Sequence, residues 1–156
     1  MRRVYASIRE AELALTPWTV SDRERFVRMQ FDAQQAHYLH HYPHSRCQVI
    51  ELVDDAGARG VGRLWLDCRA SALHVLDISL LSEARGLGIG SHCLEQLKRE
   101  AHEKSLALTI FVELHNPARR LYERLGFEAE GEPQGLYQHM VCRPPVTITT
   151  EEVCPP

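Results

Sequence analysis

A short segment rich in glycine, Arg85-Gly86-Leu87-Gly88-Ile89-Gly90-Ser91, carries the residues best suited to chemistry in this 156-residue sequence. It lies between an apolar run and a stretch with helical spacing, which predicts a strand that turns directly into a helix. The first amides of a helix have no partner within it, and the helix dipole adds partial positive charge. Because glycines carry no side chains, a phosphate can approach these amides closely, and Arg85 adds a positive charge. The segment therefore indicates a site for a phosphate-bearing ligand.

The spacing of the glycines narrows the choice of that ligand. No lysine follows them, as a P-loop would require. They form G-x-G-x-G, whereas the dinucleotide fingerprint is G-x-G-x-x-G, and Ser91 stands where its third glycine belongs. Glu113 does fall near the end of the next predicted strand, where a ribose-binding acid would lie. A dinucleotide-binding enzyme is therefore the lower-ranked alternative, because the predicted strand order leaves room for only one parallel crossover.

The remaining segments predict the elements that position this loop. Helical spacing marks residues 1–15, 21–41, 89–104 and 117–125, the second opened by a capping box from Ser21 to Glu24. Strand patterns mark residues 47–53, 60–68, 73–81, 106–114, 127–132 and 136–142. In the third strand, Leu76, Ile78 and Leu80 alternate with Val75, Asp77 and Ser79. This order predicts an α/β (α+β) domain over 1–145, with a mixed central sheet, and a tail over 146–156.

Two motifs in the sequence carry a family resemblance. Arg85 to Gly90 fit the pattern R/Q-x-x-G-x-G/A, and Asn116 to Phe127 read NPARRLYERLGF. In this order, with a helix and a strand between them, they resemble the two signatures of the GNAT superfamily of N-acetyltransferases. The resemblance covers residues 45–142. It implies a GNAT fold with an antiparallel meander, a β-α-β crossover that binds acetyl-CoA, and flanking helices. It also implies transfer of an acetyl group from acetyl-CoA to a primary amine, by direct attack in a ternary complex.

The resemblance further implies roles for particular residues. The amides from Leu87 through Ser91, with Arg85, would hold the pyrophosphate of coenzyme A. The strand ending at Leu80 would splay from the strand ending near Leu114, and the Leu80 amide would polarise the thioester carbonyl. Asn116 would hydrogen-bond the pantetheine arm, and Arg119 would reach the nucleotide end. Tyr122 would protonate the departing thiolate, a role that suits a phenol; the alternative is that Tyr122 is a core residue.

The general base and the acceptor contacts have weaker signals. Asp77, eight residues before Arg85, is a lone charge in an apolar strand and is the favoured base. A structural hydrogen bond is the alternative for it, and Glu113, His74 or a water chain are other candidates for the base. Gln30, Gln34 and Tyr38 share one helical face and are candidate acceptor contacts, with ordinary surface polarity as the alternative.

The composition restricts partners and location. The net charge is −3 and the pI about 6.3, which gives no case for nucleic acid or membrane binding. Five scattered cysteines without a C-x-x-C pair indicate free thiols and a cytoplasmic location. His37 and His41 have the i, i+4 spacing of zinc ligands, but no H-E-x-x-H glutamate supports them, so no metal site is predicted.

The acceptor and the assembly state stay open. A small polyamine, an amino acid, an antibiotic, a peptide N-terminus and a protein lysine are all compatible acceptors, and a non-catalytic acyl-CoA-binding module is the rival function. GNAT relatives usually begin with a strand, whereas this sequence starts in a helix. Either residues 2–7 form that strand or a sheet edge is left open. The tail segment VTIT, or a second subunit in a homodimer, would then cover the edge.

Overall fold

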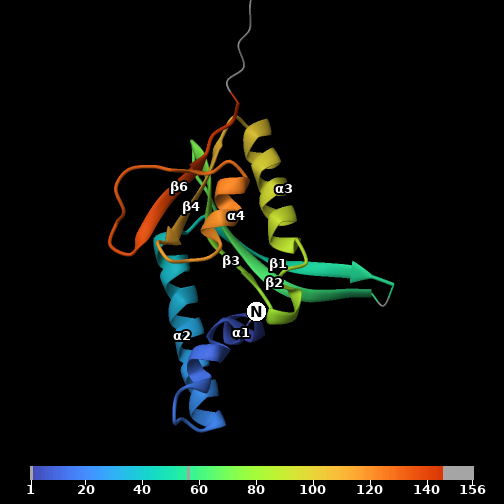
Figure 1. The fold of residues 1–156 in the computed structure, drawn as a ribbon, viewed down its shortest axis with the longest axis vertical. Coiled ribbons are helices and arrows are strands. Elements are labelled where there is room, and N and C mark those ends of the chain that lie inside the picture. Colours follow the sequence, from blue (N-terminus) through green and yellow to red (C-terminus); the bar gives the residue numbers. More distant parts are fainter. Residues whose placement is uncertain (1, 56, 146–156) are drawn as a thin grey trace, which may run out of the picture.

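The described residues, 2–55 and 57–145 of a computed structural model, form one mixed sheet in the order β1-β2-β3-β4-β6-β5 (Figure 1). Its strands are β1 (Ser45–Asp54), β2 (Gly57–Cys68), β3 (Ala72–Leu80), β4 (Ala107–Glu113), β5 (Glu128–Ala129) and β6 (Tyr137–Cys142). Among these strands, only β3 and β4 pair in parallel. The mixed sheet, the meander of β1 to β3 and the single crossover through α3 (Ile89–Glu103) are therefore confirmed.

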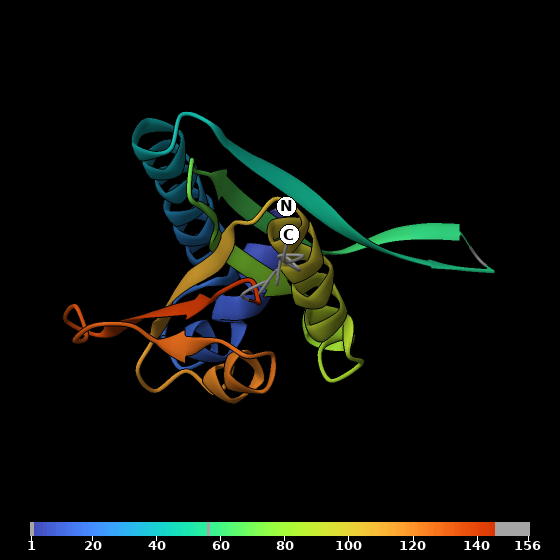
Figure 2. The same cartoon turned by 90° about the horizontal axis from the view of Figure 1, so that it is seen from above.

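The helices lie on both sides of this sheet. They are α1 (Arg2–Ala14), α2 (Val20–His41), α3, α4 (Arg119–Arg124) and the short 3-10 helix η1 (Ser82–Ala84). Seen from above, α2 and α3 lie on opposite sides of the sheet (Figure 2). Each face of β3 is therefore covered by a helix, which explains why His74 is as buried as its apolar neighbours.

The capping box predicted from Ser21 to Glu24 is wrong. The N-cap of α2 is Thr19, whose hydroxyl accepts from the Asp22 amide at 3.2 Å, while the Asp22 carboxylate accepts from the Thr19 amide at 3.3 Å. The two candidate caps look alike in the sequence, because Thr19 and Ser21 each stand three positions before an acid. Because the helix begins at Val20, Ser21 lies inside its first turn and cannot cap it.

The two faces of the sheet differ in chemistry. Residues directly opposite on paired strands share a face. The face toward α3 is apolar and includes Leu64 opposite Ile78, Leu66 opposite Val75, and Ile110 opposite Met140. The other face is largely polar and includes Arg63 opposite Ser79, Trp65 opposite Asp77, and His74 opposite Thr109. It lies against α2, where the Tyr38 ring is 4.8 Å from the Trp65 ring.

A bulge and a separation shape the middle of β3. Leu66 pairs with Val75 and Trp65 with Asp77, so Leu76 is an extra residue on β3 and the predicted alternation breaks there. The parallel ladder between β3 and β4 runs only from Ala72–Ala107 to Val75–Ile110. Beyond Val75 the two strands no longer pair, which confirms the predicted splay.

β1 forms an edge of the sheet and projects with β2 as a long hairpin (Figure 1). Helix α1 begins at Arg2, so the alternative that residues 2–7 form a strand is wrong. The segment VTIT and the rest of the predicted tail, 146–156, lie outside the described residues. Within the described part of the chain, no helix combines the length and apolar character needed to cross a bilayer.

Candidate active site

The glycine-rich loop presents bare backbone to open space. Gly86 and Gly88 have φ values of +75° and +77°, a region that L side chains rarely adopt, and a Cβ added to either would meet no atom within 4 Å. The first hydrogen bond within α3 runs from the His92 amide to the Gly88 carbonyl at 3.0 Å. The amides of residues 89–91 therefore have no partner within the helix, and no side chain caps it. This is a cradle that fits an anion.

The backbone of Leu80 faces the side from which β4 has separated. The next amide, that of Leu81, donates to the Val61 carbonyl on β2 at 2.8 Å. Successive amides of a strand point to opposite edges, so the N–H and C=O of Leu80 point away from β2. The Nε of Arg85 donates to the Leu80 carbonyl at 3.1 Å. Leu80, Arg85 and the glycine loop therefore lie along one continuous edge, in the order the sequence predicted.

Tyr122 lies on α4 and is buried, with 5% of its surface exposed. Its ring is 5.7 Å from that of Phe127, so the side chain is also part of the core. Burial, and secondly the negative charge of Asp77, raise the pKa of Tyr122 to about 12. The hydroxyl thus keeps its proton at neutral pH. The charge of Asp77 on β3 therefore acts on the Tyr122 hydroxyl, while the catalytic roles of both residues remain predictions.

Asp77 is held by a buried arginine that the sequence analysis missed. The Nε of Arg63 donates to the Asp77 carboxylate at 2.6 Å, and the Ser79 hydroxyl donates to it at 2.9 Å. The Arg63 side chain is 1% exposed, and its Nη2 donates to the Gln34 amide oxygen at 2.5 Å. Its guanidinium lies 5.5 Å from the Tyr5 ring centre. In "GVGRLWLDC" Arg63 looks like a solvent-facing position of an edge hairpin, and only the covering helices α1 and α2 make it internal.

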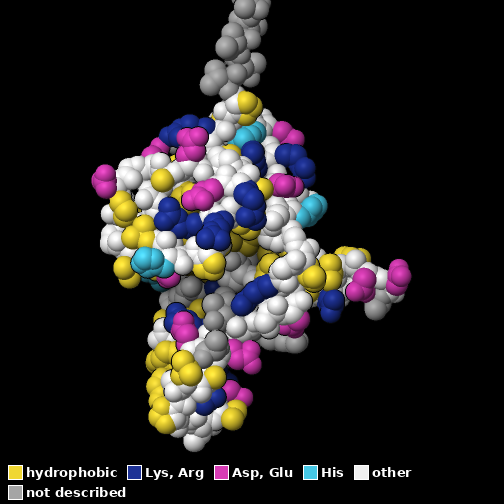
Figure 3. Space-filling model, viewed as in Figure 1, with side chains coloured by type: hydrophobic (Ala, Val, Ile, Leu, Met, Phe, Trp, Pro, Cys, Tyr) yellow, Lys and Arg dark blue, Asp and Glu magenta, His cyan; other side chains and the backbone are white. Residues whose placement is uncertain are grey.

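Asn116 and Arg119 hold the turn between β4 and α4. The Asn116 side-chain oxygen accepts from the Ala118 amide at 2.9 Å, and an Arg119 Nη donates to the Leu114 carbonyl at 3.1 Å. Lys and Arg side chains gather over α4 in Figure 3. The roles of Asn116 and Arg119 toward coenzyme A remain predictions.

A pocket of about 650 Å³ opens between α2 and the sheet, and we call it the α2 pocket. All three predicted acceptor contacts line it: Gln30, Gln34 and Tyr38. Val75 and Leu76 also line it, so it meets the sheet where β3 and β4 separate. The Tyr38 hydroxyl donates to the Leu76 carbonyl at 3.3 Å, which ties α2 to the bulge.

His74 and Glu113, the other candidate bases, have different surroundings. His74 lines the α2 pocket, and its Nδ1 hydrogen-bonds with the Thr109 hydroxyl at 2.7 Å. Burial first, and the nearby charge of Arg69 second, lower the pKa of His74 to about 4, so its imidazole is neutral at pH 7. The Glu113 carboxylate is exposed and accepts from the Tyr137 hydroxyl at 3.3 Å.

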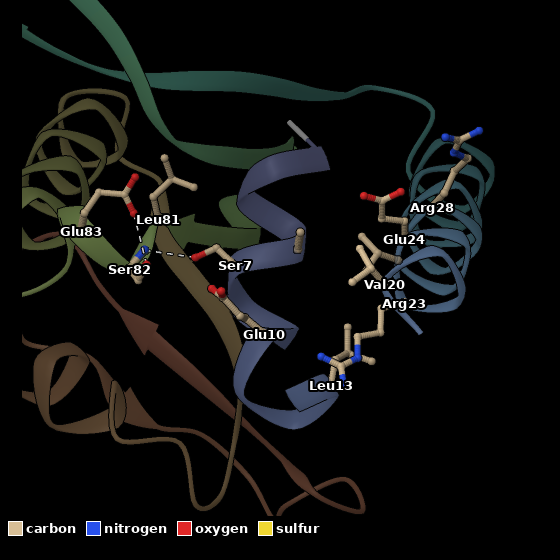
Figure 4. A pocket seen from close by; sticks show the side chains of 12 residues that line it. Ser7, Glu10, Leu13, Val20, Arg23, Glu24, Arg28, Leu81, Ser82 and Glu83 are labelled. Atoms are coloured by element: carbon tan, nitrogen blue, oxygen red, sulfur yellow. Dashed lines mark hydrogen bonds between the residues drawn. The ribbon is translucent and has the colours of Figure 1, made fainter. Parts of the chain in front are cut away.

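A second pocket of about 670 Å³, the N-terminal pocket, lies between α1, α2 and the turn after β3 (Figure 4). Ser7 and Glu10 of α1 point toward the turn at Ser82, whose amide donates to the Ser7 hydroxyl at 3.1 Å, while Arg23 and Glu24 of α2 lie on the other side of α1. The N-terminal pocket is lined by Leu81, which is five residues, about 17 Å of extended chain, beyond Leu76 of the α2 pocket. Of these two pockets, the α2 pocket is therefore the one next to Asp77.

Among the described residues, no group of three or more His, Cys, Asp or Glu side chains could hold a metal ion.

Comparison with known proteins decides the family. The family model described as an acetyltransferase (GNAT) domain matches residues 43–129, more than half of the chain. The chain belongs to the GNAT acetyltransferase family. A search of curated protein sequences returns no significant match.

Solved GNAT structures share the fold. The PaiA N-acetyltransferase of Thermoplasma acidophilum, solved with coenzyme A, is 15% identical, with a TM-score of 0.62 over 90% of this chain and 88% of its own. An acetyltransferase of Thermus thermophilus is 20% identical, with a TM-score of 0.60 over 91% and 87%. A GNAT acetyltransferase of Elizabethkingia anophelis, solved with acetyl-CoA, is 15% identical, with a TM-score of 0.57 over 71% and 82%. At these identities the likeness establishes the fold alone.

Proposed function

We propose that this GNAT protein transfers an acetyl group from acetyl-CoA to the nitrogen of a primary amine, by direct attack in a ternary complex. The observation that carries the proposal is the separation of β3 from β4 after Val75. It leaves the β3 backbone from Leu76 to Leu80 without a partner on β4, and we assign the acetyl donor to this slot, which leads to the glycine loop, with Tyr122 as the proposed acid. The Thermoplasma and Elizabethkingia proteins, solved with coenzyme A and acetyl-CoA, have the same fold.

The residues fit coenzyme A on two grounds. Gly86 and Gly88 leave open the space that a Cβ would fill, and the amides of residues 89–91 point out of α3 with no partner inside it. We assign the pyrophosphate to these amides and to Arg85, which would exchange its bond with the Leu80 carbonyl for the phosphate. The backbone of Leu80 can then hydrogen-bond the pantetheine arm or the thioester carbonyl.

When bound, acetyl-CoA supplies an activated acyl group and a thiolate leaving group. Tyr122 is suited to donate its proton to the leaving sulfur, because its raised pKa keeps the phenol protonated until charge develops nearby.

For the proton of the incoming ammonium, we propose His74 in place of Asp77. The Asp77 carboxylate is occupied by Arg63 and Ser79 and does not line the α2 pocket, whereas His74 lines it and is neutral. Thr109 fixes the orientation of the imidazole, and because the pKa of His74 is lowered to about 4, the ring would hold the proton only in passing, on its way to water in the pocket. Asp77 is then a positioning residue, which holds Arg63 against α2.

The proposal is tested by isothermal titration of the protein with acetyl-CoA, with NAD and ATP as comparators, followed by an assay of thiol release with amine acceptors. We expect binding of acetyl-CoA alone. A preference for NAD or ATP would refute the proposal and favour the dinucleotide-binding alternative. If Tyr122→Phe lost no turnover, that result would favour the rival function, a non-catalytic acyl-CoA-binding module.

A further inference from the structure

Much of the lining of the α2 pocket is aromatic. Among the described residues that line it, five are tyrosine or phenylalanine: Tyr5, Tyr38, Tyr42, Phe111 and Tyr137. Phe111 and Tyr137 are 40% and 46% exposed, although both lie on strands of the sheet. Large apolar side chains left this open inside a concave site favour a ligand that covers them.

The charges around this pocket disfavour a polycation. No Asp or Glu is among the described residues that line it, and its one permanent charge is Arg9, at the α1 side. Of the two carboxylates described beside it, Asp77 is paired with Arg63, and Glu113 is exposed and accepts from the Tyr137 hydroxyl. A ligand with several ammonium groups would lose their hydration here and meet at most the single carboxylate of Glu113.

One ammonium group is acceptable, because aromatic faces attract a single cation. The position of the pocket places such a group well. Val75 and Leu76 are among its lining residues at the point where β3 and β4 separate, next to the slot assigned to the acetyl donor. An aromatic body would then lie between the rings of α2 and those of β4 and β6, with its amine directed to the slot.

We infer that the acceptor of this protein is an aromatic monoamine, an amine carried on an aromatic body with a single positive charge, and that Phe111 and Tyr137 recognise its ring. The inference rests on the proposed function, and it excludes polyamines as the preferred acceptors. It assigns the binding energy to ring contacts in the α2 pocket, not to ion pairs.

The test is isothermal titration of the full chain, without acetyl-CoA, with three probes: 2-phenylethylamine, n-hexylamine and spermidine. We expect 2-phenylethylamine to bind at least tenfold more tightly than the other two. Phe111→Leu and Tyr137→Leu should each weaken its binding about fivefold or more and leave n-hexylamine within twofold. Trp18→Leu is the matched control, because Trp18 is 41% exposed and lies outside the pocket.

Tighter binding of spermidine, equal binding of the two monoamines, or equal loss in the Trp18 variant would each overturn the inference. The separate titration with acetyl-CoA tests the proposed function. If acetyl-CoA fails to bind while 2-phenylethylamine binds as expected, the transfer reaction is refuted and the aromatic preference of the pocket stands. If acetyl-CoA binds and the amine preference is reversed, only the inference about the acceptor fails.

Discussion

The ion pair between Arg63 and Asp77 yields the sharpest prediction about stability. Arg63 is 1% exposed and Asp77 18%, and their Nε and carboxylate oxygen are 2.6 Å apart. Arg63→Met would keep an apolar chain of similar length between the Tyr5 and Phe31 rings but leave the carboxylate of Asp77 without its cation. Breaking a buried pair by removing one partner costs about 3–5 kcal/mol. Because Asp77 keeps the Ser79 hydroxyl and some solvent, we expect the lower end, about 3 kcal/mol.

For a chain of this length, about 3 kcal/mol lowers the melting temperature by roughly 6–12 °C. The double variant Arg63→Met/Asp77→Leu removes both charges and should recover to within about 1 kcal/mol of the parent, since replacing a whole buried pair by apolar groups is often neutral. The matched control is Arg46→Met. It breaks the exposed pair with Glu100, at 3.2 Å, and should cost under about 1 kcal/mol.

Thermal and urea denaturation of the parent, Arg63→Met, Asp77→Leu and the double variant, read as a double-mutant cycle, gives the coupling between Arg63 and Asp77. The reasoning is refuted if Arg63→Met melts within about 2 °C of the parent. It is also refuted if the double variant melts as low as the single one. That second result would mean that Arg63 acts through its packing against Tyr5 and Phe31, and not through its charge.

Three further predictions concern the site. Tyr122→Phe should lower kcat by about 100-fold or more with acetyl-CoA binding within twofold, as titration and steady-state kinetics would show; a parallel loss of binding would contradict an acid role. Gly88→Ala should weaken acetyl-CoA binding about tenfold, whereas Gly131→Ala, with a similar φ of +69° and equally open space, should leave it unchanged. The pKa of His74 falls from its usual 6.5 to about 4 on folding, so the unfolded chain binds more protons between these values and stability drops as pH falls. Urea unfolding should show about 2 kcal/mol less stability at pH 5 than at pH 7 from this group, a difference that His74→Gln should remove.

Local patterns in the sequence predicted those parts of the site that depend on local structure. The glycine loop is recognisable because positive φ values and an uncapped helix start are properties of consecutive residues. Gln30, Gln34 and Tyr38 follow from helical spacing alone, and all three line the α2 pocket. The capping box was misplaced because Thr19 and Ser21 offer the same pattern two residues apart, and the sequence does not show where the helix begins.

Arg63 and the bulge at Leu76 could not be predicted, because they depend on partners distant in the sequence. An arginine in an alternating strand indicates a solvent-facing position unless a helix covers that face, and α2 is 22 residues of mixed character with little sign of which side it buries. A bulge is a mismatch between two strands, so β3 shows it only against β2. The carboxylate of Asp77 was noticed as a lone charge, but its partner Arg63 was not.

The bulge explains why the slot and the α2 pocket meet at one place. An extra residue on β3 turns the strand and sharpens its twist, so that β4 can follow only as far as Val75. Past that point the backbone groups on one edge of β3 have no partner on β4, which suits the extended pantetheine arm of the proposed donor. The polar face of β3 lies toward the α2 pocket. Tyr38 donates to the Leu76 carbonyl at the bulge itself, which satisfies a group that would otherwise be left by the broken ladder. The same irregularity therefore lies where the β3–β4 ladder ends and anchors the helix that lines the α2 pocket, so a change that removed it would disturb the proposed sites of both donor and acceptor.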